Sequence, residues 1–321
     1  MQQATVINSR LELNEEQSHL IHTLLYFSIF NYPLKLSEVI SFLGKPNPSE
    51  LSIQSNLNEL FDQGLICFED GYYFVENKNK ELVKRRKMGN SKAQFAMQKA
   101  YRFSRLMSWF PYVKCVCLSG SLSKAYMDES GDIDYFIITK PERLWIVRTL
   151  LIAYKKIFLL NSRKYFCVNY FIDTQNLEIP DKNIFTATEL LTLVPMYNGH
   201  IYKRLIDENK WANNFLPNHQ PSGYDFAKED KNNLFKRSIE FLLNGKLGNV
   251  LDTYFMQLTL KRWRTKFGHF TPENFENTMR TRKYVSKHHP RNFQQRVINS
   301  LNEKMEDFES INQVHLNLKH G

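Results

Sequence analysis

The chain has 321 residues, 42% of them hydrophobic, and a formal net charge of +10 at pH 7. A chain of this length is usually too long to fold around a single hydrophobic core, so we expect two or three modules. No window holds about eighteen uncharged apolar residues, and the N-terminus lacks the basic-then-apolar pattern of a signal peptide. We therefore expect a cytoplasmic protein without a membrane partner. Four cysteines without a CxxC pair favour buried thiols over a zinc site or a disulfide framework.

Charge is unevenly distributed along the chain. Residues 1–79 hold ten acidic and four basic side chains, a net charge of −6, so the remaining residues carry +16. Such an asymmetry favours an anionic ligand or partner for the second part and argues against one for the first.

The N-terminal part has the sequence pattern of three helices and a hairpin. Apolar residues at helical spacing over 16–31, a short helix ending at Gly44 and a third helix over 49–63 give the three helices. An Asp70-Gly71 pair between two short apolar runs predicts a β-hairpin. We assign residues 1–79 to a winged-helix-like module.

The third helix of a winged helix often contacts DNA, so its exposed side chains matter. The expected exposed positions contain no lysine or arginine: Ser52, Gln54, Ser55, Asn56, Asn58, Glu59 and Asp62. Because neutralised phosphates supply most non-specific affinity, we expect this module to dock or pack and not to bind DNA.

Residues 80–110 are predicted to form a strongly basic helix with a break at Gly89. The segment holds nine bases and one acid: Lys80, Lys84, Arg85, Arg86, Lys87, Lys92, Lys99, Arg102, Arg105 and Glu81. Arg85, Lys92, Lys99 and Arg102 fall on one face, and Phe95, Phe103, Leu106 and Phe110 on another. A solvated face is the simpler interpretation, although the position of the segment directly before the aspartate motif favours a phosphate contact for one or two of these bases.

Strands and helices alternate over residues 111–175, which predicts a mixed sheet covered by helices. The strands are expected at 113–120, 132–139 and 164–172, with a helix over 142–160 between the last two. Beyond Pro180 the patterns are helical, including residues 187–197 and 201–216. The predicted fold is α+β, with a central domain over 80–180 and a helical C-terminal domain over 181–321.

Two aspartates occur inside the second of these strands. Asp132 and Asp134 are two residues apart, so both project from one face of a strand. Paired carboxylates repel unless a cation neutralises them, and oxygen ligands favour Mg²⁺. Upstream, Gly120-Ser121 follows a strand and opens a helix, where free backbone amides favour a phosphate. Together the two features predict a site for a metal-bound triphosphate.

Gly-Ser, ten intervening residues and Asp-x-Asp between apolar strands resemble the signature of the polymerase-beta-type nucleotidyltransferase superfamily. The resemblance covers residues 111–175. It implies that Gly120 and Ser121 hold a nucleoside triphosphate, that Asp132 and Asp134 bind Mg²⁺, and that a third acid on a later strand completes a two-metal site. Lys124 stands where such motifs often carry a basic residue, and Tyr126 replaces a common glycine.

The third acid has two candidates on the strand over 164–173. Alternation places Asn169, Phe171 and Asp173 on one face. If Asn169 takes the acidic position, the site lacks a carboxylate, because an amide cannot act as a general base. If the strand runs one pleat further, Asp173 supplies the acid and a second Mg²⁺ has its ligand.

The chain layout also resembles a group of uncharacterised bacterial proteins with a winged-helix start. The shared stretches are FNYPL, the Gly-Ser and Asp-x-Asp motif, NYF, TATELL and an ENKW…LPN segment. The expected activity is transfer of a nucleoside monophosphate to a hydroxyl acceptor on a small molecule, a protein or an RNA. The alternative is a catalytically impaired nucleotide-binding or partner-binding regulatory module. The sequence leaves the acceptor, the base and the oligomeric state open.

Other candidates have simpler explanations. His288-His289-Pro290 is expected in a surface turn before the last helix, and an acceptor or nucleotide groove there is the minority interpretation. Glu189 is a single acid on a helix, for which a solvated face suffices.

Overall fold

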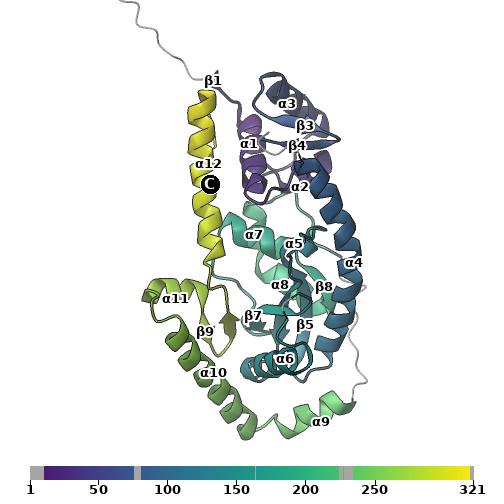
Figure 1. Ribbon diagram of the computed structural model, residues 1–321, viewed down its shortest axis with the longest axis vertical. Helices are drawn as coiled ribbons and strands as arrows, with labels where there is room; N and C mark the ends of the chain where they lie inside the picture. Colours follow the sequence, from purple (N-terminus) through teal and green to yellow (C-terminus); the bar gives the residue numbers. More distant parts are fainter. Residues whose placement is uncertain (1–10, 76–80, 163, 224–226, 228–233, 319–321) are drawn as a thin grey trace, which may run out of the picture. The chain divides into compact units, whose positions relative to one another are not determined.

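The computed structural model of the protein describes residues 11–75, 81–162, 164–223, 227 and 234–318. These residues form an α+β structure, as the sequence predicts (Figure 1). The chain divides into two compact units, one of residues 1–86, 213–219 and 295–321, the other of residues 87–212 and 220–294. This division differs from the predicted boundaries at 79 and 180, because both ends of the chain contribute to the first unit. No helix within the described residues combines the length and apolarity needed to cross a bilayer.

Within the first unit, the described residues 11–75 form three helices and a three-stranded antiparallel sheet. Its elements are α1 (Glu15–Ser28), α2 (Leu36–Phe42), α3 (Glu50–Asp62), β2 (Leu34–Lys35), β3 (Cys67–Glu69) and β4 (Tyr72–Phe74). The strand order is β2-β4-β3. The predicted hairpin is confirmed: Asp70 and Gly71 between β3 and β4 have φ of 53° and 84°, which suits the mirror-image turns of hairpins.

A polar network joins α1 to α3 and corrects one prediction. Asn56, expected on the exposed face of α3, is buried, and its amide donates to Glu16 Oε2 at 2.7 Å. The Asn14 amide donates to Asn56 Oδ1 at 3.0 Å, while the Asn14 side chain caps α1. The helical periodicity assigned Asn56 to the solvent-exposed face of α3. In the structure Asn56 faces α1, whose side of the contact is also polar.

The C-terminal segment returns to the first unit. Helix α12 (Phe293–Asn312) leads into β11 (Val314–His315), which pairs in parallel with β1 (Leu11–Glu12). The backbone N–H of Asn317 donates to Ser18 Oγ at 2.9 Å, so the last described residues are bonded to α1.

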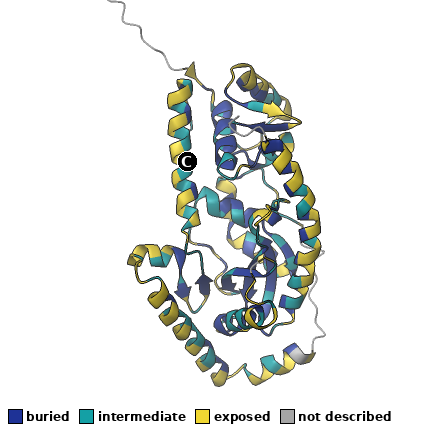
Figure 2. Ribbon diagram, viewed as in Figure 1, coloured by how far each residue is buried: buried dark blue, intermediate teal, exposed yellow. Residues whose placement is uncertain are grey.

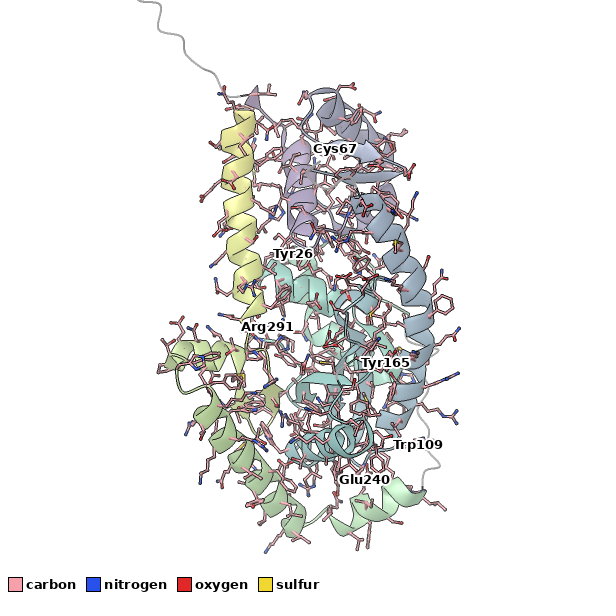
Figure 3. The ribbon with its side chains drawn as sticks, viewed as in Figure 1. Tyr26, Cys67, Trp109, Tyr165, Glu240 and Arg291 are labelled. Carbon is pink, nitrogen blue, oxygen red and sulfur yellow. The ribbon has the colours of Figure 1, made fainter. Side chains whose placement is uncertain are left out.

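Helix α4 (Leu82–Ser108) runs without the predicted break. A Cβ at Gly89 would lie 2.1 Å from a ring carbon of Tyr126, so this glycine lets the ring pack against the helix. Lys92 pairs with Glu129, and Lys99 Nζ donates to the Tyr165 hydroxyl at 2.9 Å (Figure 3). These contacts occupy two members of the predicted basic face.

Two residues of the basic segment remain to be placed, Phe95 on its predicted apolar face and Lys80 at its start. Phe95, expected with the apolar face of α4, is 71% exposed, whereas Phe103 packs against the core. Lys80 lies outside the described residues.

The second unit is built on a six-stranded sheet of order β8-β5-β6-β7-β10-β9. Its strands are β5 (Val113–Ser119), β6 (Asp134–Thr139), β7 (Cys167–Asp173), β8 (Val194–Tyr197), β9 (Thr281–Arg282) and β10 (Val285–Lys287). Strands β6 and β7 are parallel and the other neighbours are antiparallel. The inner strands are mostly buried (Figure 2).

The sheet recruits strands from the part of the chain that was predicted to be helical. The helix expected over 187–197 ends early as α7 (Ile184–Leu191), and Val194–Tyr197 forms β8 against β5. Strands β9 and β10 likewise come from beyond residue 280. The helical C-terminal domain was therefore wrong in these places, because short strands gain their stability from pairing partners that periodicity does not reveal.

The remaining helices of the described second unit flank this sheet. They are α5 (Gly120–Ser123), α6 (Leu144–Phe158), α8 (Gly199–Glu208), α9 (Leu234–Leu242), α10 (Lys246–Lys266) and α11 (Pro272–Thr278). One core cluster joins α4, α6 and α10 to strand residues such as Tyr135, Ile137 and Phe171. Glu240 on α9 accepts from the backbone N–H of Tyr112 at 2.6 Å, just before β5 (Figure 3). The opposite face, which carries Asp134, positions the candidate site.

Candidate functional site at one end of the sheet

Four predicted features meet at one end of the six-stranded sheet. Ser119 at the end of β5 pairs with Asp134 at the start of β6, and Asp134 is in register with Cys167 at the start of β7. The backbone N–H of His288, just after β10, donates to the carbonyl of Asn169 on β7 at 3.0 Å. Four neighbouring strands, β5, β6, β7 and β10, thus bring together in that spatial order Gly120, Asp134, Asn169 and the two histidines.

The Gly120 turn packs directly against Asp134. Gly120 has φ of +70°, and a Cβ at this position would lie 2.8 Å from Asp134 Oδ2. A side chain is therefore excluded on two grounds, backbone conformation and contact. Helix α5 follows as a single turn, with Ser121 exposed and Ser123 Oγ donating to the Gly120 carbonyl at 2.8 Å.

Asp134 is a half-buried carboxylate at the centre of the site. Burial raises its pKa to about 6, with the charges of Asp132 and Glu189 adding to the effect and the Cys167 thiol and Lys124 opposing it. The Asn169 amide donates to Asp134 Oδ1 at 2.9 Å. A carboxylate that is desolvated and only partly compensated is a place where a cation gains much from binding.

This pKa shift predicts a specific dependence of stability on pH. Because the native pKa of Asp134 lies above the ordinary value of 3.8, the native state binds the proton more tightly, and stability falls as pH rises from about 4 to about 6. Asp134→Asn abolishes this titration. The unfolding free energy of the variant minus that of the wild type should therefore increase by about 2–3 kcal/mol between pH 4 and pH 7 in metal-free buffer.

Chemical denaturation of both proteins at pH 4, 5, 6 and 7 with a chelator measures this change. Asp128→Asn, at an exposed position of the same connecting loop, is the matched control. A difference that stays constant across the four pH values would contradict the burial argument.

Asp132 precedes β6 and is half-buried. Its charge acts on Asp134 and on Cys167, so the two aspartates lie close enough to interact. Among the described residues, no three His, Cys, Asp or Glu side chains form a ready metal site. Two carboxylates nevertheless suit Mg²⁺, which usually takes one or two protein carboxylates and completes its shell with phosphate oxygens and water.

The strand β7 answers the question of the third acid. Between the pairs Tyr135–Val168 and Phe136–Tyr170 the register shifts by one residue, so Asn169 is the extra residue of a bulge. Simple alternation across this strand was therefore wrong, because Phe171 and Asp173 fall on the face opposite to Asp134. Asp173 is in register with Thr139 at the far end of β6, about 16 Å along the strand from Asp134.

Asp173 has a structural role where it lies. Its carboxylate accepts from the backbone N–H of Gln175 and from the Asn176 amide, each at 2.9 Å, and so closes the turn after β7. Of the two candidates, Asn169 is the residue at the site. It donates its N–H to Asp134 and accepts from Cys167 Sγ at 3.3 Å, which fixes the orientation of its amide.

Two side chains of the site were not predicted from the sequence. Glu189 on α7, expected on a solvated face, pairs with Lys124 at 2.7 Å, and Lys124 Nζ also reaches the Gly120 carbonyl at 3.2 Å. Cys167, expected as an inert buried thiol, contacts Asn169 and Asp134. Burial and the charge of Asp134 raise the thiol pKa to about 12, so Cys167 stays protonated and acts as a hydrogen-bond donor. No local motif marks either residue.

The adjacent histidines have different surroundings. The His288 ring packs against Trp263 with a centroid distance of 5.0 Å. His289 lies edge-to-face with Tyr170 at 6.1 Å, and burial lowers its pKa to about 4, with Lys287 adding to the effect and Glu189 opposing it. Both residues are half-buried and so less exposed than the expected surface turn, because the turn after β10 joins the end of the sheet.

No protein-family model matches this chain, and neither a curated protein nor a solved structure matches it. The chemical interpretation of the site therefore depends on its geometry. That geometry consists of a glycine turn packed against the half-buried Asp134, a second aspartate two residues away, and a lysine–glutamate pair beside them.

Proposed function

We propose that the protein is a Mg²⁺-dependent nucleotidyltransferase of the polymerase-beta type. The observation that supports the proposal most directly is the contact between the Gly120 turn and Asp134. A Cβ at Gly120 would lie only 2.8 Å from Asp134 Oδ2, so the backbone approaches the carboxylate closely. It brings a backbone suited to phosphate oxygens next to a carboxylate suited to a metal. The same layout of sheet, turn and paired acids supports a nucleotidyltransferase domain, and the helices and hairpin of the first unit support a winged-helix module.

In this proposal each residue of the chain has a defined task. The Gly120 turn and the exposed Ser121 bind the outer phosphates of a nucleoside triphosphate, and Asp132 and Asp134 are the ligands for Mg²⁺. Bound Mg²⁺ supplies neutralisation of the phosphate charge and polarisation of the reacting phosphoryl group. Asn169 holds Asp134 in position through its N–H donor and does not accept a proton.

The transfer itself exchanges one phosphorus–oxygen bond for another. The oxygen of an acceptor hydroxyl bonds to the α-phosphorus, the bond from that phosphorus to the bridging oxygen breaks, and pyrophosphate leaves with the electron pair. The hydroxyl proton is released to solvent. Positioning by the sheet end and electrostatic stabilisation account for the rate enhancement.

Incubation with Mg²⁺ and each of the four labelled nucleoside triphosphates, with cell extract as a source of acceptors, tests the proposal. Release of pyrophosphate together with a labelled product is the expected result. Absence of release with every nucleotide would contradict it.

We infer a further role for Glu189, which is the carboxylate that can replace the missing third acid. Lys124 neutralises it and also bonds to the phosphate-binding turn. Phosphates at that turn would attract Lys124, and Glu189 could then serve as a metal ligand.

Variants of this ion pair should change Mn²⁺ affinity in opposite directions. Glu189→Gln is expected to weaken Mn²⁺ binding about tenfold when a non-hydrolysable triphosphate analogue is present. Lys124→Met, which frees Glu189, is expected to strengthen Mn²⁺ binding without nucleotide. Electron paramagnetic resonance of free Mn²⁺ measures both. Glu178→Gln, which removes a surface partner of Lys182, is the control, and equal affinities of Glu189→Gln and Glu178→Gln would contradict the role.

A regulatory nucleotide-binding module is the second candidate function. Asn169 at the expected place of an acid favours it, because an amide supplies neither charge nor a base. Saturable binding of a Mg²⁺-triphosphate without pyrophosphate release, in the presence of extract, would identify this function. The acidic first unit then has the role of a docking module for a partner and not for DNA, since α3 exposes no described lysine or arginine.

A further inference from the structure

Two buried polar atoms beside the candidate site have no hydrogen-bond partner. They are the hydroxyl oxygen of Tyr170 and Nε2 of His289. Their rings meet edge-to-face with centroids 6.1 Å apart. Most buried polar groups in folded proteins are hydrogen-bonded, so two neighbouring exceptions indicate a place for a polar atom from outside the chain.

The sheet register places this pair on the face that carries Asp134. Phe136 shares that face by alternation with Asp134, and its ring stacks on Tyr170 at 5.1 Å. Lys287 on β10 is directly opposite Tyr170, and His289 follows two residues later on the same side. Glu189 acts electrostatically on both His289 and Asp134, which agrees with this placement.

The pair also lies at the correct end of the sheet. Strand β7 separates β6 from β10, so His289 is about 10 Å from Asp134 across two strand spacings. Asn169 lies between them and bonds to both sides, through its amide to Asp134 and through its carbonyl to the His288 N–H.

We propose that Tyr170 and His289 bind the hydroxyl group of the acceptor substrate and orient its oxygen toward the triphosphate. The proposal rests on the proposed nucleotidyltransferase function and names the side of the site from which the acceptor approaches.

The chemistry of the two side chains suits a hydroxyl group. Burial keeps the His289 ring neutral at pH 7, so the ring has one N–H and one bare nitrogen, and Tyr170 remains a phenol because burial raises its pKa. A hydroxyl group can donate to one partner and accept from the other, which satisfies both unpaired atoms at once.

Tyr170→Phe and His289→Phe in the full chain test this subsite. Each removes an atom that has no partner in the free protein, so neither variant should lower the melting temperature. Both should bind Mg²⁺ with a non-hydrolysable triphosphate analogue within twofold of wild type. Transfer to hydroxyl probes should fall by about 10- to 100-fold, the loss expected for one or two hydrogen bonds.

The probes are ribose, glycerol and N-acetylserine amide, which represent sugar, small-polyol and protein hydroxyls. Stimulation of pyrophosphate release from Mg²⁺-triphosphate is measured with each. His288→Phe is the matched control, since the neighbouring ring packs on Trp263, and it should transfer to the probes like wild type.

Several results would overturn the subsite. They are a lack of stimulation by all three probes, unchanged transfer in Tyr170→Phe and His289→Phe, or a clear loss of thermal stability in Tyr170→Phe, which would indicate a structural water at the two atoms. If wild type binds no Mg²⁺-triphosphate, the proposed function fails instead. A saturable ¹⁵N shift of the His289 ring with a probe alone would then still support the subsite, and no shift would refute it.

Discussion

Asp134→Asn is expected to reduce Mg²⁺-dependent nucleotide transfer by about 10³-fold. The Gly120 turn packs against the Asp134 carboxylate, and the Asn169 amide donates a hydrogen bond that orients this carboxylate. The variant retains the shape of the side chain but loses the charge that holds a metal against the phosphates. The rate of pyrophosphate release at saturating triphosphate measures the effect.

Asp173→Asn provides the contrast, because the sequence allows Asp173 as an alternative third acid. Asp173 lies at the other end of β7, where its carboxylate accepts hydrogen bonds from Gln175 and Asn176. We expect this variant to lose some stability and to keep transfer within a fewfold of wild type. Equal losses of transfer in both variants, with both proteins folded, would contradict the assignment of the site to the Asp134 end of the sheet.

The local part of the site was predictable from the sequence, and the part assembled by the fold was not. Gly120, Ser121, Asp132 and Asp134 are close in sequence, so a turn and a strand suffice to bring them together. The choice between Asn169 and Asp173 depends on a one-residue bulge in β7, which changes the face of every residue after it. No pattern in an isolated strand reveals a bulge.

Glu189 and His289 reach the site through long-range contacts. Glu189 is on α7, 55 positions after Asp134, and His289 follows β10, a three-residue strand whose place in the sheet is set by pairing with β7. The same reason explains the missed strands β8, β9 and β10: their sequences are too short to distinguish strand from helix. Long amphipathic helices such as α6 and α12 were predictable because their periodicity extends over several turns.

Arg86 lies in the basic segment that the sequence assigned to a solvated helix face, yet it is 2% exposed. Its guanidinium donates to the Pro33 carbonyl at 2.6 Å and to Glu38 Oε1 at 2.5 Å. The same group lies over the Tyr32 ring, 3.6 Å from its centroid. Arg86 follows Leu82 by four residues, so helical periodicity places Arg86 on the buried face of α4. Counting the charges of the segment as a whole did not distinguish this arginine from its exposed neighbours.

We expect Arg86→Met to lower the free energy of unfolding by about 3 kcal/mol. The variant leaves the Pro33 carbonyl buried without its donor and Glu38 without its cation, and methionine replaces only the packing of the aliphatic stem. Because Glu38 keeps a partly exposed side chain, the loss should be near the lower end of the range for broken buried ion pairs. Chemical denaturation measures it, with Arg85→Met as the matched control. Arg85 is an exposed base one residue away, and its replacement should change stability by less than about 0.5 kcal/mol. If the two variants unfold at the same denaturant concentration, Arg86 contributes no more than a surface charge, and the contacts around Tyr32 and Glu38 do not hold the first unit together.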